Sequence, residues 1–402
     1  MSLYEKRGVS AQKEEVHRAT AGLDGGLYPH AFCKTYPDYL GGDPGQVNIM
    51  HADGAGTKSV LAYLYWKETG DLSVWKNIAQ DAIVMNLDDL LCVGVHDHIV
   101  FNSTIDRNKR LIPGEVLSAI INGTAAFFKQ MGEYGISIRY LGGETADVGD
   151  VTRTIAVNGT MTCRWPKNKL ITNQHIVPGD VIVGLAGFGQ TKYEQAYNSG
   201  IGSNGLTSAR HDMLDREYAT RYPESFDPGM PESVRYMGKY RLTDKLPDNL
   251  QQALNSPGLD IGRLLLSPTR TFAPLMKELL GTHFDKIHGL VHCSGGGQTK
   301  CLKYLPGNFT IIKDNLFEPP PVFSLIAESS GSSARELYEV FNMGCRMEIY
   351  CSNEASGLFI EAAARHGVEA RVIGRVEAGN TKKLILRAGH ETIHYPAEPL
   401  NA

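Results

Sequence analysis

The sequence predicts an α/β (α+β) protein that folds as two lobes. Segments with strand-like and helix-like apolar spacing alternate along the chain, and glycines gather where strands give way to helices. At 402 residues the chain is long enough for two or three domains. Residues 164–169 are polar and include a proline, which places the main boundary near 165–175. We therefore expect one domain over residues 1–170 and another over 171–402.

In the first half, apolar spacing and stop signals define the expected elements. Gly70 and Gly94 each follow a helical pattern and suit the left-handed position just past a helix end. Pro113 suits the first turn of the next helix. Helices are expected over 60–69, 73–93 and 113–134, and strands over 47–52, 98–105, 136–141 and 154–163.

The second half begins with a buried strand over 180–186 and a glycine-rich loop over 187–204. Residues 218–260 have weak periodicity, so we expect an irregular excursion with short helices. Later helices are expected from residue 206, over 271–280 and over 355–365, with strands over 287–293, 346–351 and 369–376.

Composition argues against several kinds of partner. A net charge of −4 gives no strong attraction to nucleic acid or to an anionic membrane surface. No segment approaches the length of a membrane span, and the first residues lack the apolar core of a signal peptide, so we expect a cytoplasmic protein. The seven cysteines form no C-x-x-C pair, which favours buried thiols over disulfides or a zinc site.

Residues 141–147, Leu-Gly-Gly-Glu-Thr-Ala-Asp, are expected to form a loop between two strands. Gly142 and Gly143 allow the backbone to approach a ligand closely. Glu144 and Asp147 could turn toward one hard cation, because Mg²⁺ prefers oxygen ligands and shares them with phosphates. An Asx-type turn is the structural alternative.

The run Asp53-Gly-Ala-Gly-Thr-Lys58 lies between a strand and a helix and offers similar chemistry. Asp53 could hold Mg²⁺, Lys58 could meet phosphate oxygens, and free N–H groups at the helix start could receive an anion. The spacing is neither that of a Walker A loop nor that of a dinucleotide-binding fingerprint. A plain turn with helix capping fits the pattern equally well.

Asp88 and Asp89 stand late in an otherwise apolar helix. Adjacent helical residues point about 100° apart, so the two carboxylates cannot both face water easily beside Leu90 and Leu91. This favours a functional role for the pair over a solvated helix face.

Two further glycine-bearing junctions occur in the second half. Ser203-Asn204-Gly205 precedes a helix and could simply cap it, although the same free N–H groups would bind a phosphate. Ser294-Gly-Gly-Gly297 follows a strand, and three consecutive glycines indicate a close backbone approach to a ligand or to another element. His292 and Cys293, beside it, are expected to be core residues.

Taken in order, these motifs resemble the aminoimidazole ribonucleotide synthetase family, also called phosphoribosylformylglycinamidine cyclo-ligases. The resemblance covers nearly the whole chain. It rests on eight short motifs: Tyr4-Glu-Lys-Arg-Gly-Val9, Asp53-Gly-Ala-Gly-Thr-Lys58, Asp88-Asp-Leu90, Gly142-Gly-Glu-Thr-Ala-Asp147, Ser203-Asn-Gly205, Ser267-Pro-Thr-Arg270, Ser294-Gly-Gly-Gly297 and Phe341-Asn-Met-Gly344.

The resemblance implies an ATP-dependent ligase of purine biosynthesis. Such an enzyme closes formylglycinamidine ribonucleotide to aminoimidazole ribonucleotide and releases ADP and phosphate. The resemblance also implies a homodimer in which the N-terminal sheets of two protomers pair and ATP binds near their interface. The C-terminal domain is then a mixed sheet with helices that binds the substrate.

Residue roles follow from the same resemblance. Lys58 and Asp147 are the expected catalytic residues, and Asp53, Asp89 and Glu144 are the expected Mg²⁺ ligands. Further ATP-binding residues are Gly54, Gly56, Thr57, Gly142, Gly143 and Thr145, and the expected substrate-binding residues are Ser203, Asn204, Gly205, Gly295, Gly296 and Gly297.

This chain departs from the family pattern at several places. Asp88 stands where the family pattern has asparagine, and Gly202 stands where it has histidine. Gly22 to Gly26 is the only candidate for a glycine-rich lid, and residues 190–202 and 218–260 look longer than the usual connections. The alternatives are a non-catalytic nucleotide-binding paralogue or another enzyme of the superfamily, such as thiamine-monophosphate kinase.

Overall fold

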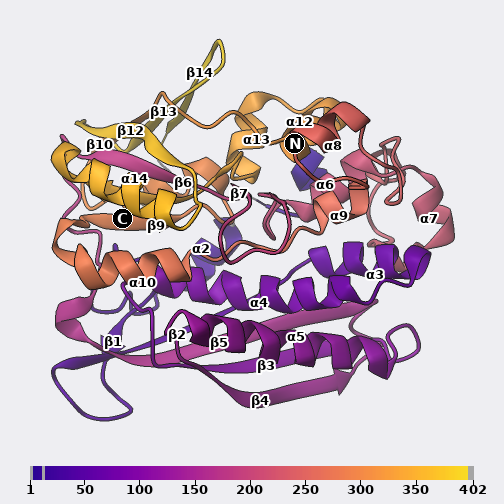
Figure 1. Ribbon diagram of the computed structural model, residues 1–402, viewed down its shortest axis with the longest axis horizontal. Coiled ribbons are helices and arrows are strands. Elements are labelled where there is room, and N and C mark those ends of the chain that lie inside the picture. Colours follow the sequence, from indigo (N-terminus) through magenta and orange to yellow (C-terminus); the bar gives the residue numbers. More distant parts are fainter. Residues whose placement is uncertain (1–2, 11–13, 397–402) are drawn as a thin grey trace.

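The computed structural model describes residues 3–10 and 14–396, in two lobes that are each built on their own β-sheet. Figure 1 shows the first sheet along one side of the molecule, with long helices between it and the second lobe. None of the described helices is long and apolar enough to cross a membrane. The seven cysteines are buried free thiols, as the sequence predicts.

A five-stranded sheet forms the first lobe. Its strands are β1 (Tyr36–Pro37), β2 (Gln46–Gly54), β3 (Ile99–Arg107), β4 (Ile138–Asp147) and β5 (Ile155–Pro166). They lie in the order β1-β2-β5-β3-β4, in which β5 is antiparallel to both neighbours and β3 is parallel to β4. Buried residues alternate with more exposed ones along β3 and β5, since successive side chains point to opposite faces.

Three helices cover one face of this sheet, which we call the inner face. They are α3 (Lys58–Thr69), α4 (Ser73–Leu91) and α5 (Gly114–Glu133). All three lie where the sequence predicts helices, and Gly70 ends α3 in the left-handed conformation. The other face, the outer face, is open in the single chain, with Met50 68% and Leu141 65% exposed. Nothing in the described part of the chain covers these apolar side chains.

Helix α4 is buried over most of its length because it lies between the two lobes. It packs on β2 and β5 on one side and on α10 (Ala273–Thr282) of the second lobe on the other. Its acidic residues Asp81 and Asp88 bond to Thr269 and Thr271 of the second lobe. A carboxylate in a buried helix needs such partners, so these aspartates mark the face of α4 that meets the second lobe.

Strand β4 extends farther than the sequence predicts. The loop expected over residues 141–147 is not formed, because these residues continue the strand beside β3. The pairing slips between Tyr140 and Gly143, where Gly142 has a φ of 81° and forms a β-bulge. The bulge shifts the alternation by one residue: Tyr140 and Gly143 both lie on the inner face, so Glu144 lies on the outer face.

A seven-stranded mixed sheet forms the second lobe. Its strands are β6 (Val181–Ala186), β9 (Gly289–His292), β10 (Phe309–Lys313), β11 (Cys345–Cys351), β12 (Ala370–Ala378), β13 (Lys383–Ala388) and β14 (Glu391–Pro396). Their order is β14-β13-β10-β12-β6-β11-β9, and only β10 and β13 pair in parallel. The mixed sheet expected from the sequence is therefore present, and β6, β9, β11 and β12 correspond to the four predicted strands.

Short helices surround the second sheet and connect it to the first lobe. They are α6 (Leu206–Met213), α7 (Glu217–Arg221), α8 (Asp248–Ala253), α9 (Ile261–Leu265), α11 (Cys301–Tyr304), α12 (Pro321–Ser330), α13 (Ala334–Val340) and α14 (Ser356–Arg365). Two strand pieces, β7 (Phe188–Gly189) and β8 (Asn198–Ser199), pair within the glycine-rich loop. Near the N-terminus lie α1 (Leu3–Lys6) and α2 (Glu14–Thr20).

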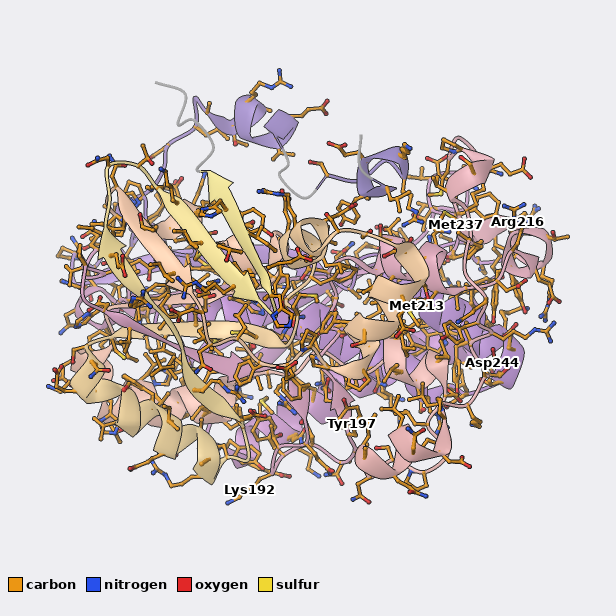
Figure 2. The ribbon with its side chains drawn as sticks, turned by 90° about the horizontal axis from the view of Figure 1, so that it is seen from above. Lys192, Tyr197, Met213, Arg216, Met237 and Asp244 are labelled. Atoms are coloured by element: carbon orange, nitrogen blue, oxygen red, sulfur yellow. The ribbon has the colours of Figure 1, made fainter. Side chains whose placement is uncertain are left out.

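The irregular excursion predicted over 218–260 is present and folds back onto the first lobe. Residues 215–263, which we call the clamp, reach α3 through side-chain bonds such as Tyr63 to Glu224 at 2.6 Å. Figure 2 shows Arg216, Met237 and Asp244 at the end of the molecule opposite the strands of the second sheet. The clamp therefore fastens the lobes together far from that sheet.

Candidate functional site

The glycine-bearing motifs of both lobes meet between the sheets. The Thr57 hydroxyl lies 3.0 Å from that of Thr207, which joins the first-lobe motif to the start of α6. Asn204 borders the triple-glycine loop, with its Nδ2 atom 3.5 Å from where a Cβ on Gly295 would lie. Motifs about 240 residues apart along the chain therefore lie next to one another between the lobes.

The Phe341-Asn-Met-Gly344 motif lies against these same loops. The Gln298 side chain, just after the triple glycine, donates to the carbonyl oxygens of Asn342 at 2.7 Å and Cys345 at 3.0 Å. Asn342 in turn donates to the Gly200 carbonyl at 2.9 Å, next to the Ser203 loop. Residues 341–344 thus link the Ser203 loop to the triple-glycine loop, the two segments predicted to bind the substrate.

Lys58 is fully buried and bonded rather than exposed to a ligand. Its Nζ donates to Asp81 Oδ1 at 2.9 Å and to the Ser267 carbonyl. Asp81 Oδ1 also accepts bonds from the N–H and hydroxyl of Thr269, at 2.7 and 2.6 Å. Burial lowers the pKa of Lys58, and the charge of Asp81 opposes that shift. The lysine expected to counter phosphate charge therefore fastens α3 and α4 to the second lobe.

Asp88 lies on the opposite side of α4 from the first sheet. It accepts bonds from the Thr271 hydroxyl at 2.6 Å and the Phe272 N–H at 3.2 Å, at the start of α10. Burial raises the pKa of Asp88 to about 7, against the effects of the Thr271 bond and of Arg346. Asp88, which stands where the family pattern has asparagine, is thus bonded to the start of α10 in the second lobe.

Asp89 is held between two histidines from different lobes. His292 Nδ1 donates to its Oδ1 at 2.6 Å, and His51 Nε2 lies 3.1 Å from its Oδ2. Burial acts to raise the pKa of Asp89, but the bonds from His292 and His51 hold it well below its ordinary value. Both carboxylate oxygens are therefore engaged by imidazoles, and Asp89 is not free to serve as the expected Mg²⁺ ligand.

The pKa values of the two histidines of this cluster shift in opposite directions. Burial alone would lower the pKa of His51, but its bonds to Asp89 and Asn86 raise it. Burial lowers the pKa of His292 to about 4, so it is neutral and its Nδ1 carries the proton donated to Asp89. His292 is a core residue, as predicted, but it is also an oriented base whose Nε2 has no partner among the described residues.

Asp53 lies at the end of β2, close to this cluster. Its carbonyl accepts from Asn86 Nδ2 at 3.2 Å, and Asn86 Oδ1 lies 3.0 Å from His51 Nδ1. The Asp53 carboxylate is exposed and accepts from the Gly54 N–H at 2.7 Å. Of the three carboxylates expected to bind Mg²⁺, Asp53 alone combines exposure with a place beside the interlobe polar groups.

Glu144 lies too far from Asp53 to share a cation with it in one chain. In the sheet, Asp53 is level with Gly143, three strand spacings away across β5 and β3. That separation is about 14 Å between Cα atoms, and Glu144 points to the outer face. The expectation that Asp53, Asp89 and Glu144 converge on one Mg²⁺ is therefore wrong for a single chain. Likewise, residues 3–10 and 14–396 contain no group of three acidic, histidine or cysteine side chains suited to a metal.

Asp147 is occupied at the rim of the first sheet. Its carboxylate bonds to Arg107 at 2.7 Å and lies 3.3 Å from Lys109. The bond from Arg107, followed by the contact with Lys109, lowers the pKa of Asp147. The catalytic role expected for Asp147 has no support from its contacts, because it points to cations of its own sheet rather than to the interlobe groups.

The predicted glycines divide into packed and accessible ones. A Cβ on Gly205 would lie 2.3 Å from the Phe341 ring, and one on Gly297 would lie 2.5 Å from the Phe341 carbonyl oxygen. Both positions also have positive φ, so packing alone requires glycine there. At Gly295 and Gly296 the nearest atoms lie at 3.5 and 3.8 Å. These two are the glycines of the loop that a ligand could approach.

Several residues at this site were not predicted from the sequence. They are Asp81, His51 and Arg346, which lie within α4, β2 and β11 rather than in glycine-rich loops. The one available signal was helical spacing, which places Asp81 near a polar face of α4 with Asn77 and Asp88. We call the group formed by Lys58, Asp81, Asp89, His292 and Arg346 the interlobe centre.

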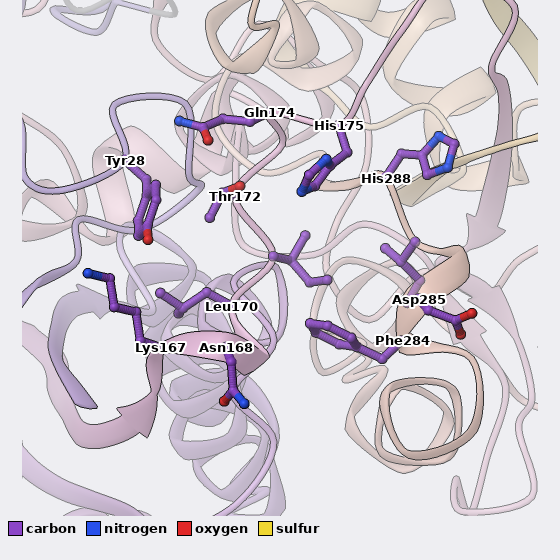
Figure 3. Close-up of a pocket in the computed structure, with 12 residues that line it drawn as sticks. Tyr28, Lys167, Asn168, Leu170, Thr172, Gln174, His175, Phe284, Asp285 and His288 are labelled. Atoms are coloured by element: carbon purple, nitrogen blue, oxygen red, sulfur yellow. The ribbon is translucent and has the colours of Figure 1, made fainter. Parts of the chain in front are cut away.

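A separate hollow of about 520 Å³ opens on the surface near the connection between the lobes. Figure 3 shows Tyr28, Lys167, His175 and His288 among the side chains around it. None of the residues predicted for the site lines this hollow. The charged and titratable side chains predicted from the sequence therefore favour the interlobe centre as the candidate site.

Two family models match this chain. One, described as AIR synthase related protein, N-terminal domain, matches residues 38–165. The other, described as AIR synthase related protein, C-terminal domain, matches residues 251–387. Together they cover more than half of the chain and leave out most of the clamp.

Curated relatives and solved structures agree with these matches. A phosphoribosylformylglycinamidine cyclo-ligase of Methanocaldococcus jannaschii is 28% identical over 82% of this chain and 77% of its own. The protein of that name from Methanothermobacter thermautotrophicus is 29% identical over 81% of this chain and 79% of its own. The structure "T. maritima PurL complexed with ATP" covers 98% of this chain and 53% of its own at 13% identity, with a TM-score of 0.51. "AaThiL complexed with AMPPCP and TMP" covers 95% of each chain at 11% identity, with a TM-score of 0.52. At these identities the two structures show a shared fold alone.

Proposed function

Because the chain belongs to the AIR synthase related family, we propose that it is an ATP-dependent cyclo-ligase. It converts formylglycinamidine ribonucleotide to aminoimidazole ribonucleotide and releases ADP and phosphate, in purine biosynthesis. The curated relatives at 28% and 29% identity carry the name of this activity and align over most of their length. The observation that carries the proposal is the meeting of the motifs of both lobes at the interlobe centre.

The reaction needs an enzyme that aligns its groups and excludes water. An amide oxygen is a poor leaving group, so phosphoryl transfer from ATP converts it to an iminophosphate. The amidine nitrogen then attacks the same carbon and expels phosphate, which closes the ring. A buried polar surface between two lobes favours both steps, since it fixes geometry and lowers the local dielectric.

We assign the two substrates to opposite sides of the interlobe centre. Ser203, Asn204 and the accessible glycines Gly295 and Gly296 hold the ribose phosphate, because they border the centre from the second lobe. ATP lies at the end of β2, near Asp53. Of the three predicted metal ligands, Asp53 is the one we retain beside the triphosphate.

We also propose that the outer face of the first sheet pairs with a second copy of the chain. Its exposed Met50 and Leu141 side chains would be covered in such a homodimer. Pairing would also place Glu144, which points to that face, beside the partner rather than beside Asp53 of its own chain.

A turnover assay tests the function directly. Purified protein with ATP and Mg²⁺ should form ADP, phosphate and aminoimidazole ribonucleotide in equal amounts, and only when formylglycinamidine ribonucleotide is present. Asp53→Asn should weaken the use of ATP more than it lowers the melting temperature, whereas Asp227→Asn in the clamp should change neither. ATP binding without substrate-dependent turnover would instead indicate a non-catalytic paralogue.

A further inference from the structure

Arg346 is buried on strand β11, where its side chain reaches Met85 of α4. It is 1% exposed. The pairing of β11 with β6 shifts between Cys345 and Met347, so Arg346 is the extra residue of a β-bulge. Bulges redirect side chains and recur beside active sites. Its carbonyl accepts from the Cys293 N–H at 2.8 Å, which fixes Arg346 beside His292 and the triple-glycine loop.

Two glycines make room for the Arg346 side chain. A Cβ on Gly187 would lie 3.1 Å from Arg346 Cβ, and a Cβ on Gly202 would lie 2.0 Å from Arg346 Nη1. Gly202 is the position where the family pattern has a histidine. The guanidinium therefore occupies space that any side chain at position 202 would take, immediately before Ser203.

The guanidinium is poorly satisfied for a buried cation. Its one hydrogen bond among the described residues runs from Nη2 to the thioether sulfur of Met85, at 3.4 Å. Nε has no partner, and no carboxylate of the described residues lies within ion-pairing distance of Arg346. Guanidinium offers five N–H donors in a fork that matches phosphate oxygens, and a buried charge without partners is costly.

Unpartnered polar atoms also occur on its neighbours. Asp81 Oδ2, His292 Nε2 and Asn204 Oδ1 are buried without hydrogen-bond partners in the described part of the chain. The charges of Asp88, Asp81 and Asp89 act on Arg346 from the α4 side, opposing the effect of burial, which lowers its pKa. These groups come from α4, β9 and the Ser203 loop. All three unpartnered atoms are hydrogen-bond acceptors, so they suit N–H or O–H groups of a ligand, whereas Arg346 supplies the donors that phosphate oxygens need.

We propose that Arg346 binds a phosphate oxyanion at the interlobe centre, and that Gly202 is a glycine in order to admit it. The inference rests on the proposed function for the identity of its ligand: the phosphate belongs either to the ribonucleotide substrate or to ATP. Position 346 thereby supplies a cation in the space that a side chain at position 202 would otherwise fill.

The competing explanation is that Arg346 only balances the charges of Asp81 and Asp88. The two explanations differ in what a neutral side chain would do. If Arg346 only balances charge, Arg346→Met would leave the negative charges of α4 uncompensated without changing the affinity for any ligand. If it binds phosphate, Arg346→Met would weaken the binding of a ligand that carries phosphate. Arg346→Lys would restore part of that binding, because lysine keeps the positive charge but lacks the planar set of donors.

The first experiment uses inorganic phosphate and requires no turnover. The melting temperature is followed as phosphate replaces chloride at constant ionic strength, for the wild type, Arg346→Met, Arg346→Lys and Arg210→Met. Arg210 is the matched control, since it is buried with unpartnered Nε and Nη1 atoms but lies on α6 against the Tyr236 ring.

Phosphate should raise the melting temperature of the wild type and of Arg210→Met, and raise it little or not at all for Arg346→Met. Arg346→Lys should fall between. An equal rise in all four proteins, or no rise in the wild type, would overturn the proposal. This outcome does not depend on whether the protein is a cyclo-ligase.

The second experiment identifies the source of the phosphate. Arg346→Met should raise one KM about ten- to a hundredfold, the range expected for hydrogen bonds to a charged group. A rise in the KM for formylglycinamidine ribonucleotide alone assigns the substrate phosphate, and a rise in the KM for ATP alone assigns the nucleotide. Unchanged KM values for both, with Arg210→Met also unchanged, would overturn the proposal even if turnover is confirmed.

Discussion

The clamp and the interlobe centre both join the two lobes through buried polar groups, but they do so differently. At the clamp, tyrosines meet carboxylates across the lobes, as Tyr63 does with Glu224 at 2.6 Å and Tyr65 with Asp260 at 3.0 Å. At the interlobe centre, Arg346, His292 and Asp81 each keep a buried polar atom without a partner in the described chain.

This difference separates structural from ligand-binding polar groups. A buried polar group with a partner stabilises one arrangement of the lobes, whereas one without a partner costs free energy in the absence of a ligand. We therefore expect substitutions at the clamp to change stability alone. Substitution of Arg346, whose guanidinium bonds only to a thioether sulfur in the described chain, should change ligand binding more than stability.

The largest expected effect concerns the buried ion pair of Lys58 and Asp81 in the interlobe centre. Asp81→Ala leaves the Lys58 ammonium buried without a carboxylate, so the free energy of unfolding should fall by about 3–5 kcal/mol. Chemical denaturation measures this change. The double variant Lys58→Met with Asp81→Leu should recover most of the loss, and a double variant as unstable as Asp81→Ala would contradict the assignment.

Asp88→Asn should stabilise the protein, in a way that depends on pH. Burial raises the pKa of Asp88 from 3.8 to about 7, so the folded chain keeps a proton that the unfolded chain releases between these values. Stability due to this group is therefore present at low pH and lost as the pH rises toward about 7.

Asparagine carries no charge at any pH, so the variant avoids that loss. Its free energy of unfolding should exceed that of the wild type by about 1–4 kcal/mol near pH 8 and differ little near pH 4. Denaturation across this range measures the difference. A gain that is equal at both ends would mean that Asp88 is ionised throughout in the folded chain.

Gly202→Ala should act through Arg346. The added methyl group would displace the guanidinium, so phosphate binding should weaken about tenfold or more in the wild-type background. In the Arg346→Met background the same change should have a much smaller effect on phosphate binding, leaving only the backbone cost of a positive φ. A double-mutant cycle measures this coupling. Additive effects would show that positions 202 and 346 act independently, which would contradict the prediction.

The smallest expected effect belongs to the clamp. Tyr63→Phe removes the hydroxyl that bonds to Glu224, and should lower the free energy of unfolding by about 1 kcal/mol. Both KM values should stay unchanged. A raised KM without a stability change would break the distinction between the two regions.

The sequence predicts the elements of the fold well, because their signals are local. Helix α4 was expected over 73–93 and spans Ser73–Leu91, since its apolar spacing and Gly94 both mark it. These features depend on residue type and spacing, which the chain displays directly.

The face of the sheet to which an individual side chain points could not be predicted from the sequence, because it depends on two β-bulges. Simple alternation from Ile138 and Tyr140 would place Glu144 on the inner face with Asp53, but the bulge at Gly142 turns it outward. Arg346 likewise reaches the centre from a bulge in β11. The register of a strand against its neighbour is set by tertiary contacts, so no local pattern shows where it slips.

Hydrogen exchange tests the location of the site most directly. The wild-type chain is compared with and without formylglycinamidine ribonucleotide and a non-hydrolysable ATP analogue. The account predicts added protection over residues 199–206, 292–298 and 342–347, which surround the interlobe centre. Protection confined to residues 167–175 and 284–288 at the surface hollow, or absent altogether, would contradict it.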